Sequence, residues 1–316
     1  MSETPIVVGD PIDSRDNEVR PFQIEGMDVR GRAVRIGTVT EQILNAHDYP
    51  EPIAKILGEL LALTGLLGSM LKYEGIVTLQ IRSEGPVKLM VADYQSKPGA
   101  AGVVRGYAQI DDEVLAQYGK NVSFGPLVTR KGHLAITIDQ GKDMERYQGI
   151  VEMKGDCLSD VAREYFASSE QLPTEIRLAC DRDPVSGHWR AGGIMVQYLA
   201  RGEVGQERIL ARDTSEQWNR AGILMKTVKF SELLDPSLTL DQLLYRLFVE
   251  DGVRVFDSML IKRGCRCSDE RIRQVIEGFG ENDLAHMTVD GKITATCEFC
   301  NTHYAYDPSE FSASKT

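Results

Sequence analysis

The sequence predicts an α+β fold followed by a small zinc-binding unit. Two patterns predict the fold class: residues that alternate between apolar and polar mark strands, and apolar residues three and four positions apart mark helices between them. A third observation sets the end of the chain apart. Four of the six cysteines lie in the last quarter, at Cys265, Cys267, Cys297 and Cys300.

The strands and helices can be placed in order along the chain. The clearest hairpin covers residues 76–94 and turns at 83–86. Alternation predicts further strands at 30–39, 134–138, 175–180 and 193–199. Apolar spacing predicts helices at 53–71, 158–168 and 215–234, and another from Leu240, where Thr239 and Gln242 form a capping box.

We expect this pattern to divide the chain into four parts. A polar, flexible N-terminal arm covers residues 1–20, and an α+β core domain covers 21–203. A helical linker at 204–258 is too small to bury its own apolar residues, so it must pack against a neighbour. The zinc-binding unit covers 259–316.

Composition limits the classes of function. With 316 residues, 42% of them hydrophobic and 26% charged, the chain is typical of a soluble globular protein. A net charge of −11 argues against broad, sequence-blind nucleic-acid binding. No secretory signal is visible, and the apolar stretch 53–71 contains Lys55 and Glu59, which favours a buried helix over a membrane span. We therefore expect a cytoplasmic protein, in which thiols stay reduced.

The clustered cysteines predict a metal site. Two close pairs, Cys265 with Cys267 and Cys297 with Cys300, supply four sulfurs, which suits one tetrahedral zinc ion. Four thiolates leave no open position for a substrate, so the site is expected to be structural. Ser268 can cap a helix after the first pair, and strands at 293–296 and 304–306 flank the second.

Several alternatives stay open at this point. His303 could replace one cysteine as a ligand, and an iron–sulfur cluster is a rival to zinc. The basic residues at 262–273 either lower the thiol pKa values of the first pair or form a solvated basic face. That basic cluster also suggests a zinc-ribbon module that binds nucleic acid. A thiol oxidoreductase is disfavoured, since its C-x-x-C motif should open a helix. Cys157 and Cys180 are interpreted as buried apolar residues.

The motifs around the cysteines resemble a known family. Cys265-x-Cys267-Ser268-x-x-Arg271, followed by Cys297-Glu298-Phe299-Cys300 and Tyr304, is similar to the redox-switch domain of the thirty-three-kilodalton heat-shock protein family. These are bacterial redox-regulated holdase chaperones of the HslO type. The stretches 164–174 and 191–197 also resemble family signatures, and the resemblance covers about residues 20–312.

The resemblance implies a non-enzymatic, ATP-independent chaperone of the stress response. It implies that the reduced, zinc-bound form is inactive. Peroxide combined with heat unfolding, or hypochlorite, then forms the redox-active disulfides Cys265–Cys267 and Cys297–Cys300. Zinc leaves, the linker unfolds, and the protein forms a homodimer that binds unfolding client proteins. No membrane partner is implied.

Overall fold

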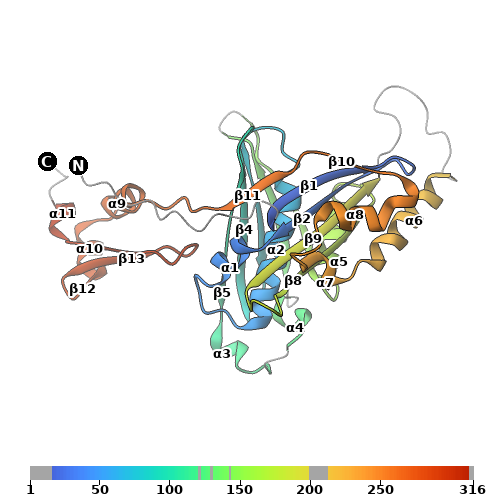
Figure 1. Cartoon of the computed structure of the whole chain (residues 1–316). Helices are drawn as coiled ribbons and strands as arrows, with labels where there is room; N and C mark the ends of the chain where they lie inside the picture. The colour runs from blue at the N-terminus through green and yellow to red at the C-terminus, as the bar shows by residue number, and fades with distance from the viewer. Residues whose placement is uncertain (1–15, 120–121, 129–130, 142–143, 199–212, 313–316) are drawn as a thin grey trace. The chain divides into compact units, whose positions relative to one another are not determined.

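The computed structural model of the chain describes residues 16–119, 122–128, 131–141, 144–198 and 213–312. The chain divides into two compact units, Met1–Arg263 and Gly264–Thr316. Figure 1 shows the first unit as one large sheet with helices on its faces, and the second as a small group of short helices and strands. The predicted α+β fold class is confirmed.

The first unit alternates strands and helices. Its strands are β1 (Asn17–Ile24), β2 (Val29–Ile36), β3 (Gly75–Arg82), β4 (Val87–Ser96), β5 (Gly102–Ile110), β6 (His133–Asp139), β7 (Tyr147–Glu152), β8 (Thr174–Arg182), β9 (Trp189–Tyr198), β10 (Val253–Val255) and β11 (Met259–Arg263). Its helices are α1 (Thr38–Leu44), α2 (Glu51–Gly68), α3 (Asp112–Leu115), α4 (Phe124–Val128), α5 (Leu158–Ser168), α6 (Asp213–Thr227), α7 (Phe230–Leu234) and α8 (Leu240–Phe248).

Long-range pairing orders the sheet. The strands of the described residues follow the order β7-β6-β3-β4-β5-β11-β1-β2-β9-β8, with β10 pairing to β1. Neighbours run antiparallel except β11, which runs parallel to β5. The predicted hairpin at 76–94 is confirmed as β3 and β4, where Val77, Leu79 and Ile81 are buried in alternation with half-buried residues.

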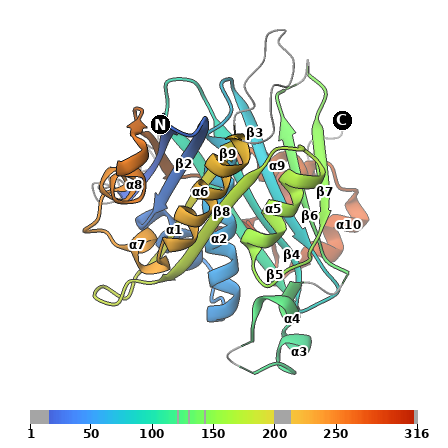
Figure 2. The same cartoon turned by 90° about the vertical axis from the view of Figure 1, so that its right-hand side faces the viewer.

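The helix α2 fills the larger core. Most of its residues are buried, and a helix that is apolar nearly all round belongs in a protein interior. Figure 2 shows α2 behind β8 and β9, with α6 and α7 in front of the same strands. No helix among the described residues is long and apolar enough to cross a membrane.

A second core lies on the opposite face of β2 and β9. In β2, Val34 and Ile36 join the core around α2, whereas Ala33 joins this second core. The helices α6, α7 and α8 cover it, and Phe248 stacks on Phe22 with ring centroids 5.7 Å apart. The capping box of Thr239 and Gln242 is confirmed, with reciprocal hydrogen bonds of 3.0 and 3.2 Å.

Three boundaries differ from those that the sequence predicts. The expected arm reaches residue 20, but residues 17–20 lie in β1, where pairing with β2 holds them; residues 1–15 lie outside the described residues. The predicted strand 30–39 ends at Ile36, because Thr38 begins α1.

The third difference concerns the expected end of the linker and the beginning of the zinc-binding unit. The sequence places residues 253–255 in the helical linker and 259–263 in the zinc-binding unit, whereas they form β10 and β11 of the first unit. These short, basic strands are stabilised by pairing with β1 and β5, which are far away in the sequence. No local sequence pattern predicts this pairing.

The second unit is small and simply built. Its elements are α9 (Asp269–Glu277), α10 (Glu281–Met287), β12 (Thr288–Val289), β13 (Lys292–Thr296), β14 (His303–Tyr306) and α11 (Ser309–Ser312). The three strands form one antiparallel sheet in the order β12-β13-β14. Its apolar core contains only Ile276, Leu284, Ile293, Tyr306 and Phe311 among the described residues.

Candidate metal centre

Each cysteine pair lies on an irregular segment of the second unit. Cys265 and Cys267 precede α9, and Ser268 caps that helix by accepting a hydrogen bond from the amide of Arg271. Cys297 and Cys300 lie in the turn between β13 and β14. The turn is closed by hydrogen bonds from the Asn301 amide to the Cys297 carbonyl (2.8 Å) and from the Cys297 amide to the Thr302 carbonyl (3.0 Å). Asn301 has φ of 57°, a conformation that asparagine tolerates well.

The fold brings all four sulfurs together. Their Sγ atoms all lie within 4.8 Å of one another. Sγ of Cys265 lies 3.6 Å from Sγ of Cys297, and Sγ of Cys267 lies 3.4 Å from Sγ of Cys300. A tetrahedral ion with Zn–S bonds of about 2.3 Å requires sulfurs about 3.8 Å apart. The four cysteines are free thiols at distances that fit zinc.

Three of the four thiols have shifted pKa values. Burial raises the pKa of Cys267 to about 12, and it also raises the pKa of Cys297. Burial opposes ionisation of Cys300 too, but the hydroxyl and amide of Thr302 outweigh it and lower the pKa to about 7. The Thr302 Oγ1 lies 3.1 Å from that sulfur. Of Cys267, Cys297 and Cys300, Cys300 is therefore the thiol that most readily becomes a thiolate.

The basic residues before and within α9 do not lower the pKa of Cys267. Arg273 forms ion pairs with Asp269 and Glu310, both at 2.6 Å. The Nη1 of Arg271 donates to the Arg266 carbonyl, also at 2.6 Å. The expectation that positive charge lowers the thiol pKa values of Cys265 and Cys267 therefore fails for Cys267, whose pKa is raised.

Thr302 is the residue near the site that sequence reasoning missed. Its signal is a hydroxyl two positions after a cysteine, in a turn whose register places it beside the sulfur. His303 lies on β14, where its Nδ1 is 2.9 Å from the Thr296 hydroxyl, and it is not among the clustered ligand atoms. Cys180 is buried and Cys157 half-buried, and both lie outside the cluster.

The fold and the site together define a class of protein: an α+β unit built on one sheet, followed by a small unit in which four thiols converge. A family model described as Hsp33 protein matches residues 17–307. The chain therefore belongs to the Hsp33 family.

Two relatives of similar sequence are both named 33 kDa chaperonin. The 33 kDa chaperonin of Caulobacter vibrioides is 43% identical over 298 residues, covering 93% of this chain and 95% of the relative. The 33 kDa chaperonin of Photorhabdus laumondii is 34% identical over 300 residues, and the match covers 95% of this chain and 96% of the relative.

A solved structure has the same fold. The crystal structure of the 33 kDa chaperonin (heat shock protein 33 homolog) of Thermotoga maritima matches with a TM-score of 0.74 at 23% identity. The match covers 94% of this chain and 97% of that one. At this identity, the similarity establishes the fold.

Proposed function

We propose that this protein is an ATP-independent holdase chaperone whose activity is switched by oxidation of Cys265, Cys267, Cys297 and Cys300. The observation that carries the proposal is the convergence of four thiols within 4.8 Å, in a unit with a very small apolar core, on a chain of the Hsp33 family. The family's chaperone name supports binding of unfolded client proteins. The protein acts as a binding partner and not as an enzyme.

In the reduced state, one zinc ion held by the four thiolates crosslinks the segment before α9 to the β13–β14 turn. Binding of zinc to small thiolate sites is worth roughly 10–16 kcal/mol at neutral pH. Five buried apolar residues cannot replace that stabilisation. The reduced, zinc-bound form is the folded and inactive one.

Oxidation removes the ligands. In each pair, Cys265 with Cys267 and Cys297 with Cys300, two thiolates give two electrons to one peroxide, and the solvent supplies two protons. The peroxide is reduced to two waters, and one disulfide forms. Hypochlorite does the same and yields chloride and one water. Two disulfides leave no thiolate for the metal, so zinc is lost and the second unit loses its main stabilising contribution.

Activation then exposes apolar surface in the first unit. The helices α6, α7 and α8 cover buried residues of β2 and β9, and their own apolar residues face the sheet. Release of these helices frees both surfaces for clients and for a second copy of the chain. We propose that the active form is a homodimer and that the protein works in the cytoplasm.

One experiment tests this function. The purified reduced protein is treated with peroxide at two temperatures while zinc release is followed with a metal-binding dye. Light scattering of a thermally unfolding client is recorded alongside. We expect one zinc per chain, release by peroxide at the higher temperature, and suppression of scattering only after release.

Matched variants sharpen the result. Cys300→Ser removes one ligand and should abolish switching, whereas Cys157→Ser lies outside the cluster and should leave it intact. The proposal is wrong if zinc is released and both disulfides form but client scattering stays at the level of the untreated protein.

A further inference from the structure

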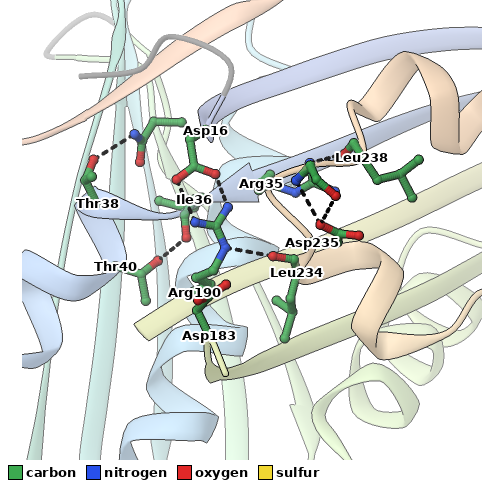
Figure 3. Close-up of polar contacts among 12 residues, drawn as sticks. Asp16, Arg35, Ile36, Thr38, Thr40, Asp183, Arg190, Leu234, Asp235 and Leu238 are labelled. Carbon is green, nitrogen blue, oxygen red and sulfur yellow. Dashed lines mark hydrogen bonds and ion pairs between the residues drawn. The ribbon is translucent and has the colours of Figure 1, made fainter. Parts of the chain in front are cut away.

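A loop of the first unit is bound to the sheet through its main-chain carbonyls. We name residues 229–239, which comprise α7 and the connection to α8, the linker loop. The carbonyl groups at the end of a helix lack partners within it. In the linker loop, two arginines of the sheet provide those partners, Arg35 of β2 and Arg190 of β9 (Figure 3).

Arg35 uses all three of its side-chain nitrogens on the linker loop. Its Nε donates to the Leu233 carbonyl at 3.0 Å, its Nη2 donates to the Glu232 carbonyl at 3.0 Å, and its Nη1 donates to the Leu238 carbonyl. Arg35 is only 1% exposed, and burial lowers its pKa to about 10. A cation is costly to bury, and these three bonds offset that cost together with the nearby carboxylates of Asp16, Asp235 and Glu18.

Arg190 holds the next carbonyl and connects the loop to the N-terminal side of β1. Its Nε donates to the Leu234 carbonyl at 2.7 Å. Its Nη1 donates to Asp16 at 2.9 Å, and its Nη2 donates to the other oxygen of the same carboxylate. Figure 3 shows Arg190 lying between Asp16 and Leu234. The fork geometry of the guanidinium allows one side chain to bind both groups at once.

The linker loop sits over apolar surface. Leu233 and Leu238 are buried in the same core as Ile194 and Val196 of β9. The loop also precedes α8, whose Leu240, Leu243 and Leu244 are buried there. Detachment of the loop therefore uncovers the sheet face and the apolar side of α8.

We propose that Arg35 and Arg190 are positioning residues that set how readily the linker loop leaves the sheet, and so set the oxidant level at which the holdase is activated. This inference rests on the proposed function, because it concerns the regulation of the same covered surface. The bonds go to main-chain carbonyls, so they require that the loop is folded, and the Asp235 carboxylate of the same loop adds an electrostatic attraction to Arg35. Together the two arginines bind four carbonyls of the linker loop, and we expect these hydrogen bonds to break together when the loop leaves the sheet.

Lysine is the informative replacement at each position. It keeps the positive charge and most of the length, but it is a compact donor and cannot hold three carbonyls as the planar guanidinium of Arg35 does. Arg35→Lys and Arg190→Lys should therefore loosen the linker loop while the fold is kept. Arg30→Lys is the matched control, since Arg30 lies exposed on the same strand as Arg35.

The test uses the full-length, reduced, zinc-loaded protein. Hydrogen exchange is measured for the amides of residues 232–244 and, as a reference for global stability, for those of α2. We expect Arg35→Lys to speed exchange of the 232–244 amides by about tenfold, because losing charge-assisted hydrogen bonds shifts the local equilibrium by at least that factor. Exchange in α2 should change far less, and Arg30→Lys should match the wild type.

A titration with hypochlorite, read by suppression of client scattering, completes the test. Arg35→Lys and Arg190→Lys should become active at lower oxidant than the wild type, with zinc content unchanged before oxidation. The inference is overturned if exchange at 232–244 is unchanged, or if it rises only together with exchange in α2. If the loop loosens as expected but no variant suppresses scattering at any oxidant level, the arginines do hold the linker loop on the sheet, but the proposed holdase function is wrong.

Discussion

The carbonyl oxygen of Leu233 occupies the space that a side chain at Gly192 would need. A Cβ atom built on Gly192 would stand 2.6 Å from that oxygen and 3.2 Å from its carbon. Gly192 pairs with Arg35 across β2 and β9. Gly192, which leaves space for the linker loop, therefore lies beside Arg35, which binds the loop's carbonyls. The close approach of the linker loop to the sheet depends on Gly192, and the hydrogen bonds of the loop to the sheet depend on the neighbouring Arg35.

Gly192→Ala should push the linker loop off the sheet. Overpacking of this kind typically costs about 1–3 kcal/mol. Because the oxygen belongs to a main chain, it cannot rotate away as a flexible side chain would. We expect higher binding of an apolar dye by the reduced, zinc-loaded variant, and activation at lower oxidant. Unchanged dye binding, together with a crystal structure showing Leu233 in place, would contradict the prediction.

Thr239→Ala should weaken the start of α8. The Thr239 hydroxyl accepts from the Gln242 amide at 3.2 Å, and loss of such a cap costs about 1 kcal/mol. The effect should appear as faster hydrogen exchange in α8 of the reduced protein. Thr227→Ala is the control, because that exposed hydroxyl donates to the Leu224 carbonyl at the end of α6 and caps no helix start. Equal exchange in the two variants would speak against a role for the cap.

Metal removal should unfold the second unit and leave the sheet of the first unit folded. Chelation under reducing conditions removes a stabilisation of roughly 10–16 kcal/mol, which the small core around Ile293 and Tyr306 cannot replace. We expect rapid proteolysis within residues 264–312 and protection of β3 and β4, with readdition of zinc restoring resistance. A chelated protein that keeps the proteolysis pattern of the zinc-loaded one would show that the metal does not hold this unit together.

Glu59→Gln should stabilise the protein at alkaline pH. Burial raises the pKa of Glu59 from 4.5 to about 8, against the opposing effect of nearby Lys55. A raised pKa means that the contribution of this group to stability is complete below pH 4.5 and is lost as pH rises toward about 8. Glutamine stays neutral, so the variant should exceed the wild type in free energy of unfolding at pH 9, by up to roughly 5 kcal/mol for a shift of this size.

The measurement for Glu59 is denaturant unfolding between pH 5 and pH 9. The difference between Glu59→Gln and the wild type should grow across this range. The exposed Glu164 provides the control, since Glu164→Gln removes a carboxylate at the surface of α5. A difference that stays constant with pH would mean that Glu59 is already ionised in the folded protein.

Local patterns predicted the elements whose stability is local. The hairpin of β3 and β4, the buried α2 and the cap of α8 each carry their own sequence signal, and each was found. The strands β10 and β11 carry none, because their hydrogen bonds go to β1 and β5, far away in the chain. Likewise β1 begins within a polar segment whose composition predicts an arm until its partner strand is known.

The candidate site divides in the same way. Spacing and residue type were sufficient to group the four cysteines, since soft ligands in two close pairs are typical of a tetrahedral metal site. The acidity of Cys300 could not be predicted, because it depends on where the Thr302 hydroxyl points. The hydrogen bonds from Arg35 to the linker-loop carbonyls could not be predicted from the sequence either, since an arginine in a strand is usually a surface residue.

The order of the strands bears on recovery after stress. The chain leaves the sheet after Tyr198 in β9 and returns at Val253 in β10, and β1 and β2 join those two strands side by side. If α6, α7 and α8 detach as proposed while these strands stay paired, they do so as a loop anchored at both ends and not as a free tail. Loop closure costs little more as such loops lengthen, so the entropic cost of re-docking within one chain would stay small. Under the proposed redox switch, this strand order would let the helices return to the sheet once the thiols are reduced again.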